Sequence, residues 1–411
     1  MKVLIIGSGT SAHSCAEQLI DNDNIEIMMF TKENNIEYSP CVLPDYVSGE
    51  LSKDDIFLRE EEFYEHNHDI IFKKDTEIKS INFTKKLVST NKQNKYYYDR
   101  LVIATGAEAI IPDMEGVNLK GNHKIKNLKD AQKLRKINNQ KIFVIGSGPI
   151  GVEISQALNQ NNKVTLVEKE KQILPKLFDE EISDFANNIL GNMGINIILN
   201  SSLNKIIGKN KVEKVRCANK LYDCDKIIWC IGMNPSTGFI DGNCLNLDRR
   251  DFIKTDEYMK TNLKDVFACG DCTSTYDLIK KDYNNVMLWH IAKRGGKIAG
   301  ENILGKNRSM PFLNNQYTIK IGSQYFGALG GNKYNKEELE IYSFNSGKKY
   351  FKFKFRGDEL VNCQTIDGPQ ILSSFKTKLN KRIPKLKKDF KEKSYIKILR
   401  RNRGGWMYSV R

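Results

Sequence analysis

The sequence lacks any uninterrupted apolar run of the roughly 18 residues that a membrane-spanning helix needs. The apolar run that follows Met1 is also too short for the core of a secretory signal, and a glycine turn interrupts it where a cleavage site would stand. We therefore expect this run to be a buried strand and the protein to be cytoplasmic. With 411 residues, 40% of them hydrophobic, the chain can form two or three soluble domains.

A cysteine framework is also missing. An odd number of cysteines, nine, is dispersed through the chain, which favours reduced thiols over structural disulfides. They are Cys15, Cys41, Cys217, Cys224, Cys230, Cys244, Cys269, Cys272 and Cys363. Cys269 and Cys272 form a C-x-x-C, but no second such pair and no histidine pair completes a zinc site. We therefore expect no metal centre, and we keep redox chemistry at this pair as a minor alternative.

Acidic residues are scarce near the end of the chain. The whole sequence carries a net charge of +15, and the residues from Ile371 to Arg411 include fourteen lysines and arginines but only two acids. A tail this basic can attract polyanions. A binding module for nucleic acid or an anionic membrane is therefore one alternative. A solvated helix face with a frayed end explains the same composition, so we expect neither partner.

Glycine, by contrast, is placed with a clear pattern at the start of the chain. An apolar run from Val3 to Ile6 leads into the turn 7–12, which reads G-S-G-T-S-A, and a helical pattern and a second apolar run, 25–30, follow. This is the β-turn-α-β setting in which such a turn cradles a pyrophosphate at a helix N-terminus. Gly7 would allow the bend, Gly9 the close approach of the phosphates, and Ala12 close helix packing.

The ribose position of this first turn departs from the usual pattern. Thr31 stands at the end of the second strand, where an acidic residue usually binds a ribose hydroxyl. Glu33 follows two residues later, and whether it substitutes for the missing acid is left open.

A second copy of the same unit runs from Lys141 to Lys169, with the turn 146–151 reading G-S-G-P-I-G. Its three glycines are Gly146, Gly148 and Gly151, and Glu153 follows them. Glu168 ends the next strand, 22 residues after Gly146, close to the spacing of about 20 expected for a ribose-binding acid. A carboxylate there would repel a 2′-phosphate, so we favour NADH over NADPH, although Lys169 and Lys171 weaken the preference.

Three further apolar runs end in glycine turns. They lead into Ala104-Thr105-Gly106, into Gly232 of a G-x-N-P, and into Gly270-Asp271. Further on, 349–355 alternates strictly between apolar and other residues, and 360–366 can be its return strand, which indicates a hairpin.

The order of these motifs resembles the FAD- and NAD-dependent pyridine nucleotide-disulfide oxidoreductases over about residues 1–305. The segment around Cys41 is similar to the single-cysteine branch, which includes NADH oxidases, NADH peroxidases and coenzyme A-disulfide reductases. The resemblance implies FAD on the first turn and NADH on the second. It also implies that Asp271 bonds the flavin ribityl chain and that Cys41 lies against the flavin ring.

Cys41 is the expected catalytic residue. A redox thiol must be accessible and ionised, and no second cysteine follows in 42–46. Cys41 is therefore expected to cycle as a sulfenic acid, a mixed disulfide or a persulfide. A buried, inert cysteine is the alternative.

Some residues depart from the branch. Thr10 stands where its oxidases and peroxidases usually carry a histidine, which disfavours peroxide chemistry, and His13 is expected to be packed in its helix. His290 is expected with equal weight as a packed helix residue or a flavin contact. The tail offers Tyr395 and Tyr408 as unaligned counterparts of substrate-site tyrosines.

The expected fold is α/β, with two interleaved Rossmann-like dinucleotide-binding domains plus a C-terminal α+β interface domain. FAD would be bound by 1–115 and 236–310, and NAD by 116–235, while 311–411 would form a homodimer. The expected activity is reduction of a thiol-derived disulfide, persulfide or polysulfide, or of oxygen, by NADH. The alternative is an electron-transfer flavoprotein that reduces a small redox protein such as rubredoxin.

Overall fold

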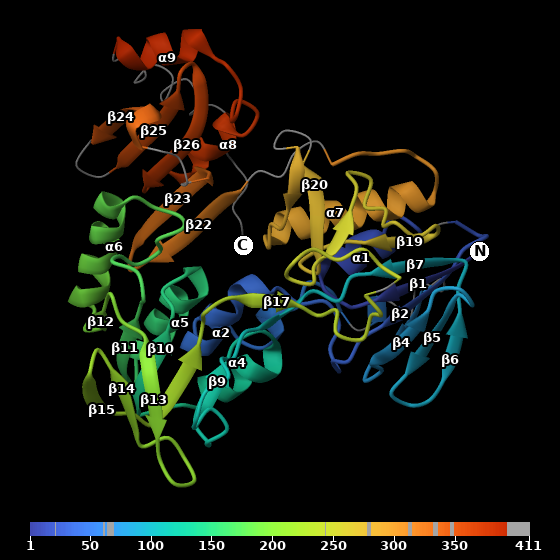
Figure 1. The fold of residues 1–411 in the computed structure, drawn as a ribbon, viewed down its shortest axis with the longest axis horizontal. Coiled ribbons are helices and arrows are strands. Elements are labelled where there is room, and N and C mark those ends of the chain that lie inside the picture. The colour runs from blue at the N-terminus through green and yellow to red at the C-terminus, as the bar shows by residue number, and fades with distance from the viewer. Residues whose placement is uncertain are drawn as a thin grey trace. The chain divides into compact units, whose positions relative to one another are not determined.

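Figure 1 shows the computed structural model of the chain. It describes residues 1–20, 22–60, 62–63, 70–242, 244–277, 281–310, 315–331, 336–345 and 349–392. The chain divides into two compact units. Unit 1 comprises Met1–Ile110, Ile125–Arg135 and Gly232–Leu313, and unit 2 comprises Ile111–Lys124, Lys136–Ile231 and Asn314–Arg411. Among the described residues, no helix has the length and apolar character needed to cross a membrane.

The centre of unit 1 is a five-stranded parallel sheet in the order β19-β7-β1-β2-β3. Its strands are β1 (Lys2–Ile6), β2 (Glu26–Phe30), β3 (Ile70–Lys73), β7 (Arg100–Ile103) and β19 (Val266–Ala268). The two strands predicted around the first glycine turn are thus confirmed as β1 and β2. Strands β2 and β3 lie on one side of β1, and β7 and β19 lie on the other. The strand order therefore changes direction between β1 and β7. Open α/β sheets bind ligands at the carboxyl ends of the strands at such a switch point.

Both faces of this sheet are covered, as expected for a parallel sheet. Val3 and Ile5 point to one face and pack with α1 (Thr10–Ala16) and α7 (Trp289–Ile303). Leu4 and Ile6 point to the other face and pack against a small antiparallel sheet. That sheet consists of β4 (Ile78–Asn82), β5 (Leu87–Thr90) and β6 (Lys95–Tyr97).

The remaining elements of unit 1 surround the ends of these strands. They are η1 (Pro40–Val42), α2 (Leu43–Ser48), η2 (Asp54–Ile56), β8 (Ala107–Ala109), α4 (Leu128–Arg135), β17 (Met233–Pro235), β18 (Ile253–Thr255), β20 (Thr273–Asp277) and β21 (Asp282–Asn284). Helix α4 lies within the range expected for the NAD-binding domain, yet it groups with unit 1 because it packs on α2.

Unit 2 repeats the parallel sheet in the order β12-β11-β10-β16-β9. Its strands and helices are β9 (Asn122–Lys124), β10 (Lys141–Ile145), α5 (Pro149–Asn159), β11 (Lys163–Val167), α6 (Glu180–Asn192), β12 (Asn196–Ile198) and β16 (Lys226–Trp229). An antiparallel sheet again covers one face, made of β13 (Leu203–Ile207), β14 (Lys214–Cys217) and β15 (Lys220–Asp223). The second β-turn-α-β unit of the sequence is therefore confirmed.

The end of unit 2 is an antiparallel sheet in the order β22-β23-β26-β25-β24, followed by two short helices. The elements are β22 (Gln316–Ile321), β23 (Gln324–Gly330), η3 (Lys336–Glu338), β24 (Leu339–Asn345), β25 (Tyr350–Arg356), β26 (Glu359–Ile366), α8 (Pro369–Phe375) and α9 (Pro384–Lys391). Strands β25 and β26 form the predicted hairpin.

The alternating strand β25 is buried on both of its faces. Its phenylalanines lie in the core with α8 and α9, while Lys352 and Lys354 are only 9% and 5% exposed. Both ammonium groups contact the carboxylate of Asp179, the N-cap residue of α6, at 2.9 and 2.6 Å. Burial alone would raise the pKa of Asp179, but hydrogen bonds from the two lysines lower it to about 2. This ion cluster joins the C-terminal sheet to α6 within unit 2.

The described part of the basic tail has an ordinary structural role. In α9, Leu386 and Phe390 are buried, while Lys385 and Lys388 lie on the exposed side. Lys387 forms an ion pair with Glu340 of β24. This arrangement fits the solvated helix face that we expected from the composition. Tyr395 and Tyr408 lie outside the described residues.

Replacing Gly296 of α7 by alanine would place a Cβ atom 2.0 Å from the carbonyl oxygen of Ser11 in α1. Because the two backbones would have to separate, we expect the free energy of unfolding to fall by about 2 kcal/mol. Gly191→Ala in α6 is the matched control, since no neighbouring atom lies within 4 Å of its Cβ position. Urea denaturation measures both variants, and equal midpoints would contradict the expectation.

Candidate functional site

The first glycine turn closes tightly against the loop that follows β7. Gly7 donates its N–H to Phe30 at 2.8 Å and has a φ of 123°, and a Cβ atom there would lie 2.1 Å from the carbonyl oxygen of Ala104. Only glycine fits this position. Gly9, which precedes α1, has no neighbouring heavy atom within 4 Å of its Cβ position, while Ala12 is fully buried. The turn therefore has one side closed by protein and one side open.

The second glycine turn reproduces this arrangement in unit 2. Gly146 donates to Val167 at 2.8 Å, and its Cβ position lies 2.5 Å from the carbonyl oxygen of Cys230. A Cβ atom on Gly151 would collide with the carbonyl oxygen of Gly146 at 1.9 Å. Gly148, like Gly9, has open space at its Cβ position.

Thr31 occupies in the first unit the place that Glu168 occupies in the second. The hydroxyl of Ser147 donates to Glu168 Oε2 at 2.7 Å, and the N–H of Glu170 donates to Oε1 at 3.0 Å. In the first unit, the hydroxyl of Ser8 donates to Thr31 Oγ1 at 2.8 Å, and an N–H two residues further on, that of Glu33, donates to the same oxygen at 3.1 Å. The two positions therefore share a bonding pattern and differ in charge.

The side chain of Glu33 is hydrogen-bonded to a neighbouring tyrosine. It accepts a hydrogen bond from the hydroxyl of Tyr38 at 2.9 Å, and the same hydroxyl accepts the N–H of Leu128 in α4 at 3.2 Å. Burial raises the pKa of the Glu33 carboxyl, while Tyr38 opposes the shift. A ribose contact by Glu33 stays a prediction.

The other predicted loops come together at the carboxyl ends of the strands. The carbonyl oxygen of Gly106, which follows Thr105, accepts the N–H of Ser236 at 2.9 Å, so the loop after β7 is tied to the segment that follows β17. Gly232, with a φ of 124°, precedes β17, and this strand pairs with β8.

Glu153, the acid that follows the second glycine turn, lies half-buried in α5 of unit 2.

Gly270 and Asp271 lie beside the first turn. Gly270 has a φ of 82°, and a Cβ atom there would come within 2.5 Å of Ser11 Oγ. Asp271 keeps about a quarter of its side chain exposed, and its Oδ2 lies 3.7 Å from Lys126 Nζ. Sequence reasoning missed Lys126, because only the return of the chain into unit 1 before α4 brings it here.

The C-x-x-C pair is buried beneath this loop. Cys269 and Cys272 are both fully buried, and burial raises the pKa of both thiols, that of Cys272 to about 11. These are the properties of packed, protonated thiols. Within the described part of the chain, no group of three or more metal-binding side chains forms a metal site.

Cys41 differs from these thiols in being exposed. It lies in η1, directly before α2, and the sequence contains no further cysteine until Cys217. Arg135 of α4 fixes the far end of α2, since its Nη1 donates to the carbonyl oxygens of Tyr46 and Leu51, both at 2.9 Å. The loop that carries the thiol is thus held in place by a segment distant in sequence.

The two histidines singled out by the sequence lie in the middle of α1 and at the start of α7. His13 is 1% exposed, and burial lowers its pKa to about 3, with the nearby Arg59 acting in the same direction. The expectation of a packed histidine is therefore confirmed. His290 lies in the first turn of α7, and its contact with a flavin stays a prediction.

Comparison with known proteins identifies the family. The family profile described as pyridine nucleotide-disulphide oxidoreductase matches residues 1–296. The chain belongs to this family.

Two relatives and one solved structure illustrate how this oxidoreductase compares with other proteins. An NADH oxidase of Methanocaldococcus jannaschii is 32% identical over 397 residues, covering 90% of this chain and 88% of the relative. An NAD(P)H coenzyme A polysulfide/persulfide reductase of Pyrococcus horikoshii is 28% identical over 336 residues, covering 80% and 75%. The covalent putidaredoxin reductase–putidaredoxin complex shares the fold, with a TM-score of 0.86 at 20% identity, covering 98% of each chain.

The residues present fit the two dinucleotides that the family implies. Gly9 and Gly148 leave open the space that a side chain would fill, and each lies where a helix begins after a buried strand. The chain is accordingly an NAD(P)H-dependent flavin oxidoreductase with Rossmann-type sheets.

Alkylation of the native protein should separate its cysteines by burial. We expect iodoacetamide to label Cys41 and Cys244 first, because these two are exposed. The fully buried thiols should react at least about tenfold more slowly, since they must first be uncovered by local unfolding. They are Cys15, Cys217, Cys224, Cys269, Cys272 and Cys363. Peptide mass spectrometry over a time course measures this, and labelling of Cys41 at the rate of Cys269 would contradict it.

Proposed function

We propose that this protein uses NADH and FAD to reduce a disulfide, persulfide or polysulfide substrate, or oxygen, at the single redox thiol of Cys41. The observation that carries the proposal is the exposed Cys41 at the start of α2, with no cysteine close behind it in sequence to form a disulfide. The other thiols of the first sheet and its helices are buried.

FAD would lie on the first glycine turn and NADH on the second. The FAD contacts would come from Gly7, Gly9, Ala12, Thr31, Glu33, Ala104, Thr105, Gly106, Gly270 and Asp271. The NADH contacts would come from Gly146, Gly148, Gly151, Glu153, Glu168 and Gly232. The open space at Gly9 and Gly148 supports both assignments. When bound, FAD would relay two electrons from NADH to the sulfur of Cys41.

The chemistry at Cys41 needs a thiolate. With a disulfide R–S–S–R, the Cys41 sulfur would attack one sulfur, the S–S bond would break, and the leaving thiolate would take a proton. Two electrons and one proton then restore the Cys41 thiolate and release a second thiol. The named activities of the two relatives, NADH oxidation and polysulfide or persulfide reduction, support these substrate classes.

NADH is favoured over NADPH because of Glu168. Its carboxylate is buried against Ser147, whose N–H and hydroxyl both donate to Oε2, so a negative charge is fixed beside the second turn. A 2′-phosphate placed here would meet like charge. The two lysines that could offset this charge are paired with other acids, Lys169 with Glu170 at 3.8 Å and Lys171 with Glu180.

The wider organisation is proposed to follow the expected boundaries. Residues 1–115 and 236–310 would bind FAD, residues 116–235 would bind NAD, and residues 311–411 would form a homodimer interface in a cytoplasmic protein. The separate five-stranded antiparallel sheet of the C-terminal part supports a boundary near residue 311.

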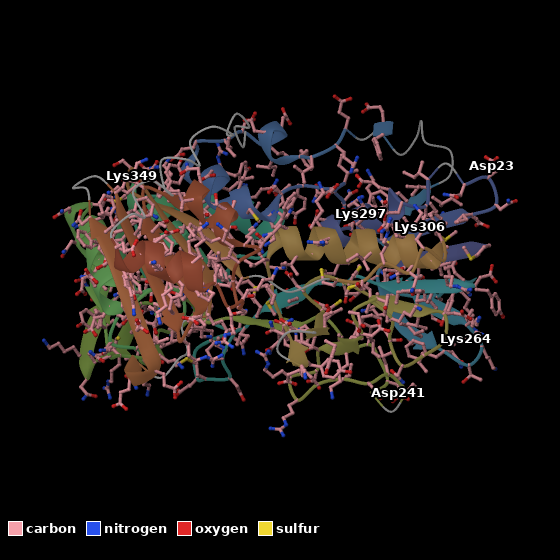
Figure 2. The ribbon with its side chains drawn as sticks, turned by 90° about the horizontal axis from the view of Figure 1, so that it is seen from above. Asp23, Asp241, Lys264, Lys297, Lys306 and Lys349 are labelled. Carbon is pink, nitrogen blue, oxygen red and sulfur yellow. The ribbon has the colours of Figure 1, made fainter. Side chains whose placement is uncertain are left out.

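A second candidate function is electron transfer to a small acidic redox protein such as rubredoxin. The likeness of fold to a reductase solved with its redox partner favours it. Lys293, Arg294 and Lys297 lie exposed along α7, and Figure 2 labels Lys297 there. These cations could attract an acidic partner. Under this function Cys41 would not be needed.

Replacing Cys41 by serine distinguishes the two functions. We expect NADH-dependent reduction of coenzyme A disulfide or polysulfide to fall at least about a hundredfold, because a hydroxyl cannot replace the thiolate nucleophile. Reduction of a one-electron dye by NADH should persist. Unchanged disulfide and polysulfide reduction in the variant, in a preparation with full flavin content, would reject the role of Cys41.

Replacing the open glycines by valine tests the cofactor assignment. Gly9→Val should preserve the fold but lower the amount of FAD bound, because the side chain would fill the space left for the phosphates. Gly148→Val should keep normal FAD content and raise the KM for NADH at least about tenfold. Flavin absorbance and steady-state kinetics measure both, and the reverse pattern would show that the two turns are assigned the wrong way round.

A further inference from the structure

A serine of the second glycine turn is hydrogen-bonded to the acid at the end of the neighbouring strand. Ser147, the second residue of the turn, is fully buried, and Glu168, directly after β11, is 7% exposed. The hydroxyl of Ser147 donates to Glu168 Oε2 at 2.7 Å, and the N–H of Ser147 donates to the same oxygen at 2.8 Å. Both donors of Ser147 are therefore directed at the carboxylate.

The backbone on each side of this contact is fixed as well. The N–H of Glu168 donates to Ile198 of β12 at 2.9 Å, and its carbonyl oxygen accepts the N–H of Ser201 at 2.9 Å. The carbonyl oxygen of Ser147 accepts the N–H of Leu174 at 3.0 Å. Because both backbones are held, only the side chain of Glu168 is left to be oriented, and Ser147 bonds it twice.

The carboxylate of Glu168 has little acceptor capacity left for a ligand. A carboxylate offers about four lone-pair sites. Ser147 uses two of them at Oε2, and the N–H of Glu170 uses one at Oε1, at 3.0 Å. The remaining site at Oε1 can accept a ribose hydroxyl, whereas a 2′-phosphate would meet it with like charge and no proton to donate.

We propose that Ser147 is a positioning residue for the coenzyme site, whose hydroxyl fixes the Glu168 carboxylate in the orientation that accepts a ribose hydroxyl and repels a 2′-phosphate. The inference rests on the proposed function only in taking the second glycine turn as the NADH site, and it does not depend on Cys41. Without this hydroxyl, Oε2 loses one of its two donors, and the carboxylate can turn toward water. It then binds the ribose less well and repels a 2′-phosphate less strongly.

The first glycine turn offers a matched contact that lacks the charge. The hydroxyl of Ser8 donates to Thr31 Oγ1 at 2.8 Å, at the equivalent position of the first unit. Loss of the Ser8 hydroxyl would remove a similar hydrogen bond without disturbing a carboxylate. Ser8→Ala is therefore the matched control for Ser147→Ala.

The test is the affinity of the FAD-loaded, full-length protein for NAD⁺ and NADP⁺, measured by isothermal titration calorimetry. These two ligands differ only in the 2′-phosphate, and because they are oxidised they leave the flavin unreduced. In Ser147→Ala, we expect the Kd for NAD⁺ to rise and the Kd for NADP⁺ to fall, so that their ratio changes about tenfold in favour of NADP⁺. Ser8→Ala should leave this ratio unchanged.

Steady-state kinetics give a second readout. With a one-electron dye as acceptor, the ratio of kcat/KM for NADH to that for NADPH, per bound flavin, should fall by a similar factor in Ser147→Ala. Equal losses of affinity for both ligands would overturn the proposal, because a damaged turn weakens both alike. An equal change of the ratio in Ser8→Ala would also overturn it.

A second variant covers the case in which Ser147→Ala does not fold. Ser147→Gly removes the same hydroxyl and introduces the residue that turn conformations accept most readily. Its ratio should change in the same direction and by a similar factor, and an unchanged ratio in the folded variant overturns the inference.

A cycle with Glu168→Gln separates the inference from the coenzyme assignment on which it rests. In the Glu168→Gln background, loss of the Ser147 hydroxyl should alter the ratio by less than about twofold, because the charge that it orients is gone. A full tenfold change there would show that Ser147 acts independently of Glu168, which overturns the inference. A ratio that Glu168→Gln alone leaves unchanged would instead reject the proposed role of Glu168. A ratio that responds to Glu168→Gln but not to Ser147→Ala rejects the inference alone.

Discussion

The close approach of a glycine to a neighbouring carbonyl oxygen is the constraint on which both parallel sheets depend. A Cβ atom on Gly7 would lie 2.1 Å from Ala104, and one on Gly146 would lie 2.5 Å from Cys230. These contacts bring the turn after β1 against the loop after β7, and the turn after β10 against the loop after β16. In each sheet these two strands are neighbours at the point where the strand order changes direction. A side chain at either position would force the two strands apart and remove the cradle that the turn forms.

Because the two β-turn-α-β units have the same arrangement of strands and turns, one residue at the end of the second strand can make them differ in charge. A serine hydroxyl of the turn and an N–H two residues further on donate to Thr31 at the end of β2 and to Glu168 at the end of β11, and Glu168 also accepts the N–H of Ser147. The main difference between the two positions is therefore the carboxylate of Glu168. Charge fixed on a rigid strand end needs little reorganisation to act on a ligand. A repeated fold can therefore carry different charges at equivalent positions without a change in its backbone.

The sequence was informative where structure is local. Strands, helices and glycine turns follow each other within about thirty residues in each Rossmann-type unit, and both were predicted correctly. The contacts of Lys126 with Asp271 and of Lys354 with Asp179 join residues 145 and 175 positions apart. No short pattern encodes such pairs, because each depends on where the chain returns after a whole domain. The burial of β25 on both faces was hidden for the same reason.

Chemical reactivity of the thiols is likewise decided by tertiary structure rather than by the cysteines themselves. The pair at Cys269 and Cys272 has the spacing of a redox or zinc motif, yet full burial raises the pKa of both thiols and keeps them protonated. Cys41, which no second cysteine follows closely in the sequence, is exposed. Nucleophilic attack requires both access and a thiolate, so burial removes the C-x-x-C pair from such chemistry whatever its spacing.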